Sequence, residues 1–195
     1  LMQHVDSILR ARWVIPVNAK KDILENHAVV MDCGKIVEIL PAELINTHYT
    51  ATHDTYFDQH AVLPGFINTH THVGMNMMRG LCQDLPLMEW LKCYIWPLEN
   101  LIISEESVHT AALSGIAELI KSGTTCINDM YYYAQQTVNA AMTAGIRATV
   151  AETITKIKSP ISNSVDDCWL RTIQLFETLD ESSNPLINAS LGPHA

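Results

Sequence analysis

The strongest constraint on the fold is a regular alternation of strand and helix patterns after residue 65. Four apolar runs of strand length are separated by segments in which apolar residues recur at helical spacing. The strand runs are apolar on both faces, as in parallel strands that are covered by helices. The sequence therefore predicts a parallel α/β architecture. The expected strands are residues 66–69, 124–130, 146–153 and 186–191, and the expected helices are residues 104–123, 134–144 and 164–179.

The number of strands bears on how much of a fold the chain contains. A (β/α)₈ barrel takes about 250 residues. This chain has 195 residues and reaches its fourth apolar strand just before the closing Gly192-Pro193-His194-Ala195. We therefore expect the N-terminal portion of a longer protein. The alternative is a small three-layer α/β domain that is complete with four strands.

Residues 1–60 have a β pattern without a recognisable helix. Asp32-Cys33-Gly34-Lys35 has the composition of a hairpin turn between two of the expected strands. We expect part of a small β-sandwich domain at residues 1–60 and a second domain at residues 61–195. The strands expected in the first domain are residues 5–9, 13–17, 27–31 and 35–40.

Two histidines stand at the end of the first apolar strand after residue 65. Pro64-Gly65 marks a turn, a short strand follows, and His70-Thr71-His72 comes where that strand ends. Side chains alternate along a strand, so His70 and His72 share one face, about 6.6 Å apart at the backbone. Both rings can then bind one divalent cation, with Zn–N bonds of about 2.0–2.1 Å. We expect His70 and His72 to be metal ligands, and a pair of surface histidines is the alternative.

The long connection at residues 73–103 is rich in Met, Trp and Leu. A connection of this length is usually functional, and thioethers and indoles pack well on flat ligands. Trp90 is therefore a candidate for substrate binding, although its apolar neighbours also fit the buried stripe of a short helix. Glu99 follows Trp96-Pro97, where we expect a helix to stop. Its carboxylate is either an acceptor for two hydroxyl groups or a solvated surface group.

Charge and cysteine content exclude several classes of partner. The formal net charge is −9 without any cluster of Lys and Arg, which argues against a nucleic-acid partner. The five cysteines form no Cys-x-x-Cys pattern, as expected for reduced thiols in the cytosol. The sequence shows no leader pattern and no apolar run long enough to span a membrane. We therefore expect a cytoplasmic protein without a membrane partner.

Several separated segments resemble one family in the same order. LPGFINTHTH (residues 63–72) resembles the first barrel strand of the amidohydrolase superfamily. Within that superfamily, residues 74–100, LIKSGTTCINDMYY (residues 119–132) and the closing SLGPHA look like the 5-methylthioadenosine/S-adenosylhomocysteine deaminases. The likeness extends over residues 36–195 and implies an amidohydrolase-type (β/α)₈ barrel with a small β-sandwich domain. About four of the barrel strands would be present in this chain.

The resemblance also implies roles for individual residues. His70 and His72 would bind a single divalent metal ion, for which zinc is expected and Fe²⁺ is the alternative. Glu99 would hold the ribose hydroxyls of a nucleoside, and His194 would contact the bound substrate. The remaining ligands and the catalytic groups of the family come from later strands, so no catalytic residue is expected within residues 1–195.

The implied reaction is hydrolytic deamination of 5-methylthioadenosine or S-adenosylhomocysteine to an inosine product and ammonia. The complete protein would be a homo-oligomer, and the 195-residue chain alone would be inactive. One alternative is another amidohydrolase that acts on a substituted heterocycle, such as a guanine deaminase or an s-triazine hydrolase. An alternative of a different class is a non-catalytic, metal-dependent binding or assembly module.

Overall fold

The structure is a computed structural model that describes residues 2–194. The chain divides into two compact units, Leu1–Pro64 and Gly65–Ala195. Among the helices of residues 2–194, none is both long and apolar enough to cross a membrane.

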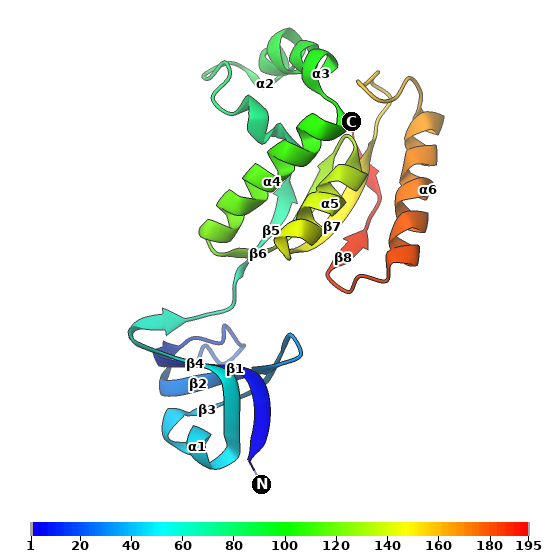
Figure 1. The fold of residues 1–195 in the computed structure, drawn as a ribbon. Coiled ribbons are helices and arrows are strands. Elements are labelled where there is room, and N and C mark those ends of the chain that lie inside the picture. Colours follow the sequence, from blue (N-terminus) through cyan, green and yellow to red (C-terminus); the bar gives the residue numbers. More distant parts are fainter. Residues whose placement is uncertain (1, 195) are drawn as a thin grey trace. The chain divides into compact units, whose positions relative to one another are not determined.

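The first unit is built on a four-stranded sheet in the order β3-β2-β1-β4 (Figure 1). β1 pairs antiparallel with β2 and parallel with β4. The buried aliphatic side chains of this unit include Val5, Ile8, Val30 and Leu40. The strands form one sheet, so the β-sandwich stays a prediction. Their bounds are β1 (Gln3–Val14), β2 (Leu24–Asp32), β3 (Lys35–Pro41) and β4 (Tyr49–Val62).

The expectation that no helix interrupts residues 1–60 is wrong. A short helical segment, η1 (Ala42–Leu44) and α1 (Ile45–His48), joins β3 to β4. This segment buries a single side chain, Ile45, and therefore leaves no periodic pattern in the sequence. β4 is also missing from the expected strands, because Thr, His and Asp make up seven of its 14 residues and its apolar residues do not alternate regularly with polar ones.

The second unit contains a parallel sheet in the order β5-β6-β7-β8. The predicted parallel α/β arrangement is confirmed for these strands. The short segment β9 (Gly192–Pro193) also pairs with β7. The strands are β5 (Phe66–Thr71), β6 (Thr124–Tyr131), β7 (Arg147–Ile154) and β8 (Ile187–Ala189), and the main helices are α4 (Glu105–Lys121), α5 (Ala134–Ala144) and α6 (Val165–Ser182).

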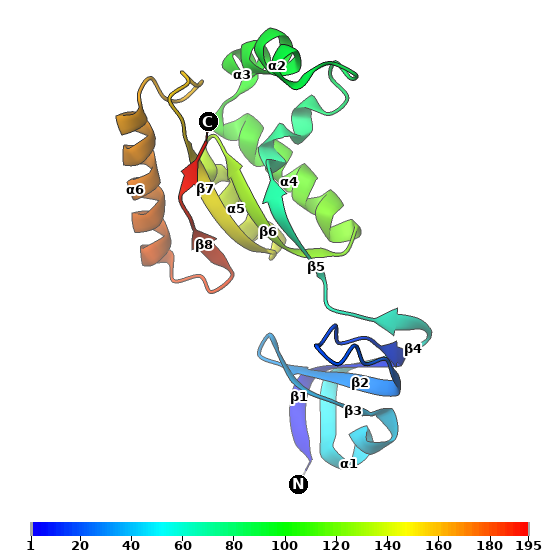
Figure 2. The same cartoon turned by 180° about the vertical axis from the view of Figure 1, so that it is seen from behind.

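The three main helices of this unit, α4, α5 and α6, pack against one face of the sheet. Figure 1 shows α4 and α5 in front of the strands, and the view from behind shows the other face without a helix of residues 65–194 over it (Figure 2). Ile116, Val138, Val150 and Leu175 belong to the buried cluster between the sheet and its helices. Alternation along β6 then directs Asn128 and Met130 away from the helices.

The connection at residues 73–103 is mostly helical. α2 and α3 lie beyond the carboxyl ends of β5, β6 and β7 in both views (Figures 1 and 2). The expectation that a helix stops at Pro97 is wrong, because Pro97 lies in the first turn of α3, where a helix does not need its N–H. The segments are η2 (Val73–Met78), α2 (Leu87–Trp90), the π-helical turn η3 (Leu91–Ile95) and α3 (Trp96–Ile102).

Serine side chains begin the two longest helices. The Ser104 hydroxyl accepts a hydrogen bond from the Ser107 N–H at 3.2 Å at the start of α4. The Ser164 hydroxyl accepts one from the Asp167 N–H at 3.1 Å at the start of α6. Gly145 ends α5 with a φ of 70°, a conformation that glycine adopts without strain. These local signals fix the helix ends and leave the carboxyl ends of the strands open for a site.

Candidate metal and substrate site

The structure places His70 and His72 side by side at the carboxyl end of β5. Their ring centroids lie 4.9 Å apart with an interplanar angle of 81°. The Nδ1 of His72 is hydrogen-bonded to the carbonyl oxygen of Met130. A carbonyl only accepts, so in the neutral ring Nδ1 carries the proton, and Nε2 is then the nitrogen that can bind a metal ion. This outer hydrogen bond is the usual means of fixing a metal-binding histidine.

The pairing of β5 with β6 is irregular beside the two histidines. Asn68 pairs with Ile127 and Thr71 with Asp129, so β5 advances three residues while β6 advances two. An extra residue of this kind re-aims side chains. The simple alternation from which the sequence predicted a shared face is therefore interrupted between Asn68 and Thr71. The two imidazoles nevertheless line the same cavity.

The carboxylate of Asp129 is buried next to residues 71–73. Its Oδ2 accepts hydrogen bonds from the Thr71 hydroxyl at 2.8 Å and from the Val73 N–H at 2.7 Å. The residue is 1% exposed. Burial raises the pKa of Asp129 to about 6, and the two hydrogen bonds oppose that rise. The same carboxylate therefore contacts both chain neighbours of His72.

A cavity of about 680 Å³ opens beside the histidines. Its walls come from the end of β5, the helical connection and the ends of β6 and β7. Most of the lining side chains are apolar or aromatic, with a few polar groups among them, which is typical of a small-molecule site. The predicted site residues His70, His72, Trp90, Glu99 and His194 all line it.

Glu99 is the buried acidic group of this cavity. It is 4% exposed, so the alternative of a solvated surface glutamate is wrong. The Tyr131 hydroxyl donates a hydrogen bond to its Oε1 at 2.8 Å. Burial raises the pKa of Glu99, while this hydrogen bond lowers it. Burial and the nearby Glu99 also raise the pKa of Tyr131, which keeps the hydroxyl protonated as the donor.

Trp90 and His194 stand at other walls of the cavity. The Trp90 Nε1–H donates to the carbonyl oxygen of Leu81 at 3.1 Å, which holds the indole in place. Trp90 also packs in an apolar cluster around Met78 and Ile95, as the buried-stripe alternative expects, and its role in substrate binding stays a prediction. His194 is exposed, and its backbone N–H donates to the Ile154 carbonyl oxygen at 2.8 Å beside β9.

Two residues of the site have partners that could not be assigned from the sequence. For Tyr131-Tyr132-Tyr133 the sequence predicts packing, with one ring possible at the rim of the pocket, and for Asp129 it predicts a supporting hydrogen bond. Each residue finds its partner far along the chain, Tyr131 at Glu99 and Asp129 at residues 71 and 73. No local pattern connects such distant residues, so the fold had to be known first.

The histidine pair suits a metal ion but supplies only part of a coordination shell. Structural and catalytic zinc sites use three or four protein ligands. Residues 2–194 contain one group of three His, Cys, Asp or Glu residues whose ligand atoms lie within 4.8 Å of one another. This group is Asp6, Asp32 and Cys33, in the first unit. Among residues 2–194, no third ligand atom of this kind stands with His70 and His72.

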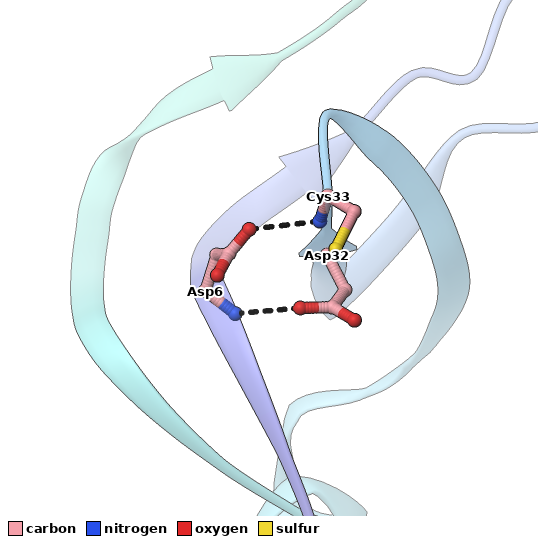
Figure 3. Close-up of side chains that lie close together, drawn as sticks. All are labelled: Asp6, Asp32 and Cys33. Carbon is pink, nitrogen blue, oxygen red and sulfur yellow. Dashed lines mark hydrogen bonds between the residues drawn. The ribbon is translucent and has the colours of Figure 1, made fainter.

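The group at Asp6, Asp32 and Cys33 has a structural explanation. Figure 3 shows the Asp32 carboxylate accepting from the Asp6 N–H, at 3.3 Å, and the Asp6 carboxylate accepting from the Cys33 N–H, at 2.8 Å. These bonds tie β1 to the turn between β2 and β3. Asp6 and Cys33 are exposed, and we assign no ligand to this group.

The comparison with known proteins decides the family. The model of the amidohydrolase family matches residues 61–195. The chain belongs to the amidohydrolase family. The resemblance noted for the histidine strand and the segments after it is thereby confirmed.

Two relatives resemble 97% and 69% of the chain. A 5-methylthioadenosine/S-adenosylhomocysteine deaminase of Saccharophagus degradans is 36% identical over 190 residues, 97% of this chain and 42% of that protein. A 5'-deoxyadenosine deaminase of Methanococcus maripaludis is 40% identical over 135 residues, 69% of this chain and 31% of that protein. The chain thus spans less than half the length of these relatives.

A solved structure of the family extends the likeness to three dimensions. The crystal structure of an adenosine deaminase from Xanthomonas campestris, with bound zinc, has a TM-score of 0.94 and 32% sequence identity. The alignment covers 100% of this amidohydrolase chain and 44% of that chain.

Proposed function

We propose that the protein is a metal-dependent aminohydrolase that deaminates an adenosine-type nucleoside. The observation that carries this proposal is the convergence of His70, His72 and the buried Glu99–Tyr131 pair on one largely apolar cavity. The names of the relatives support the same chemistry, since they are deaminases of adenine nucleosides.

We propose further that residues 61–195 are the first half of a (β/α)₈ barrel and that residues 1–60 are part of a small β-sandwich domain. The parallel order β5-β6-β7-β8, with helices on one face, supports the first part. In such barrels the chemistry takes place at the carboxyl ends of the strands, where His70 and His72 stand. The remaining metal ligands and the catalytic proton-transfer groups would come from later strands.

In this proposal, His70 and His72 hold one divalent cation, with zinc as the expected metal. When bound, the cation supplies the activation of water that hydrolysis needs at neutral pH. The protein's own part is orientation. The Met130 carbonyl oxygen fixes the ring of His72, and a neutral imidazole is the form that binds a metal ion.

The substrate would be held by the other walls of the cavity. Glu99 can accept hydrogen bonds from two ribose hydroxyls, and Tyr131 keeps one of its oxygens in place. Trp90 offers an indole face for packing against the flat base or an apolar 5'-substituent. His194 would contact the substrate from the wall beside β9. The products would be ammonia and the inosine-type nucleoside.

A substrate panel tests this function. The complete protein, loaded with zinc, should release ammonia from 5-methylthioadenosine, S-adenosylhomocysteine or 5'-deoxyadenosine much faster than from guanine or an amino-s-triazine. Removal of the metal with a chelator should abolish the reaction, and added zinc should restore it. Turnover of guanine or the triazine alone would show that the substrate is a free heterocycle rather than a nucleoside. Stoichiometric zinc without turnover of any of these compounds would support the non-catalytic module.

A further inference from the structure

We propose that Asp129 is a positioning residue for the metal site, because its carboxylate binds the Thr71 side chain and the Val73 backbone, on either side of His72. This inference rests on the proposed metal-binding function of His70 and His72. In this role Asp129 does not touch the metal or the substrate but sets where the His72 ring points.

The contacts form a clamp over three consecutive residues. Thr71 and Val73, on either side of His72, both donate hydrogen bonds to Oδ2 of Asp129. The ring of His72 itself is hydrogen-bonded to the carbonyl oxygen of Met130, the next residue of β6. Residues 71, 72 and 73 are thus each tied to Asp129 or Met130, at the carboxyl end of one neighbouring strand.

The sheet alone does not hold His72 in this position. β5 ends at Thr71, and His72 has a φ of −134° and a ψ of 69°, outside the range of a regular strand. The pairing of β5 with β6 is also irregular just before this point. The His72 carbonyl oxygen accepts from the Met75 N–H at 2.9 Å, and the bonds from Thr71 and Val73 to Asp129 hold the residues on either side. The Nε2 of His72 would move if the clamp relaxed.

The charge of the carboxylate accounts for the strength of the clamp. Hydrogen bonds to an ionised acceptor are shorter and stronger than neutral ones, and both bonds here end on the same oxygen. The second oxygen, Oδ1, is buried and has no hydrogen-bond partner among residues 2–194. Asparagine would retain one acceptor oxygen but lose the charge.

Glu152 provides a matched control on the neighbouring strand. It is also buried near the carboxyl end of its strand, β7, and also has one oxygen without a partner among residues 2–194. Its other oxygen accepts from the Ala134 N–H at 3.1 Å, at the start of α5. Glu152→Gln therefore removes a buried carboxylate of the same unit without touching residues 70–73.

The test measures metal binding rather than activity alone. In the complete protein, Asp129→Asn should weaken zinc binding about tenfold to a hundredfold, the range observed when a partner of a metal ligand is replaced. Competition with a chromogenic chelator gives the affinity. The visible spectrum of the cobalt(II) form should change in band position or intensity, because that spectrum reports ligand geometry. Glu152→Gln should leave both readouts as in the unmodified protein.

Variants of Thr71 separate the clamp from general damage. Thr71→Val removes one of the two donors at nearly constant volume and should weaken zinc binding, whereas Thr71→Ser keeps the hydroxyl and should restore it. Unchanged affinity and cobalt spectrum in a folded Asp129→Asn protein would overturn the positioning role. An equal loss in Asp129→Asn and Glu152→Gln would overturn it too. Failure of the unmodified protein to bind zinc would instead contradict the proposed function.

Discussion

At the scale of single residues, Glu99 decides between a nucleoside and a free heterocycle as substrate. If its carboxylate binds the ribose hydroxyls, Glu99→Gln keeps the volume but removes the charge from those bonds. Hydrogen bonds to charged groups contribute about 1.5–3 kcal/mol, so kcat/KM for a ribosyl substrate should fall roughly tenfold to a hundredfold. Steady-state kinetics of ammonia release in the complete protein measures this change.

The control for Glu99 is a substrate without the hydroxyls. A 2',3'-dideoxy analogue already lacks the contact, so Glu99→Gln should barely change its kcat/KM. Comparing the two substrates in one variant cancels any general effect on folding. Equal losses of kcat/KM on both substrates would mean that Glu99 only supports α3. Triazines and free bases would then again be candidate substrates.

Glu152 makes a separate prediction about the pH dependence of stability. Burial raises its pKa from 4.5 to about 7, with the Ala134 hydrogen bond opposing the rise. The folded protein therefore binds this proton more tightly than the unfolded chain. The contribution of Glu152 is most favourable below pH 4.5 and is lost as pH rises toward 7. The full difference is on the order of 3 kcal/mol.

Replacing Glu152 should remove that loss. Glu152→Gln in the complete protein should be more stable than the unmodified protein at pH 8, and the two should converge toward pH 5. Chemical unfolding at the two pH values measures the difference. Glu106→Gln, at an exposed position in the first turn of α4, is the control and should change little at either pH. A Glu152→Gln protein that is less stable at pH 8 would contradict the buried-charge explanation.

The sequence predicted individual residues of the site but not the hydrogen bonds that join them. The predicted pair at His70 and His72 depended on local spacing, and both rings do line one cavity with Glu99, whose side chain is buried. The bond from Tyr131 to Glu99 and the bonds from residues 71 and 73 to Asp129 join residues more than 30 positions apart. A single sequence contains no periodicity at that distance, so only the folded chain shows them.

At the scale of elements, Gly74 sets how closely η2 approaches β6. A Cβ on Gly74 would lie 2.5 Å from Cδ1 of Tyr131, whose ring is buried and hydrogen-bonded to Glu99. Gly74→Ala must therefore displace the ring or the helical turn, and overpacking of this kind costs about 1–3 kcal/mol. We expect a lower Tm and a smaller preference for ribosyl over dideoxy substrates.

A double-mutant cycle tests this contact. Tyr131→Leu removes the ring that the new methyl group would strike, so Gly74→Ala should cost less stability in that background than in the unmodified protein. Additive losses would show that Gly74 is constrained by something other than Tyr131.

Elements with strong local signals were predictable, and those defined by tertiary pairing were not. The helices α4 and α6 begin at serine caps and carry acidic residues in their first turns, and both lie close to their predicted bounds. β4 is polar and α1 is a single turn, so neither has the periodicity that identifies an element. Pairing with β1 defines β4 along nearly its whole length.

At the scale of the whole molecule, α6 shows a feature that the described residues do not explain. One face of α6 packs on the sheet through buried residues such as Cys168 and Leu175. Another exposes a stripe of large apolar side chains, Trp169, Leu170, Ile173 and Phe176. Exposed apolar patches of this kind mark contact surfaces. In the proposed half-barrel, the helices that follow β8 would cover the stripe.

A charge on this stripe should therefore have opposite effects in two forms of the protein. Residues 65–195 produced alone expose both the stripe and the edges of the parallel sheet, so they should aggregate, and Ile173→Glu should reduce the aggregation. In the complete protein the same charge would be buried and should lower Tm, because burying an unpaired charge destabilises the folded state. Thr178→Glu, at an exposed polar position of α6, should do neither. Light scattering follows the first effect and thermal unfolding the second.

An unchanged Tm for Ile173→Glu in the complete protein would show that the stripe stays in solvent there and would remove the support that it gives to the half-barrel. A monomeric 65–195 product that melts sharply and deaminates the nucleoside would refute the half-barrel itself.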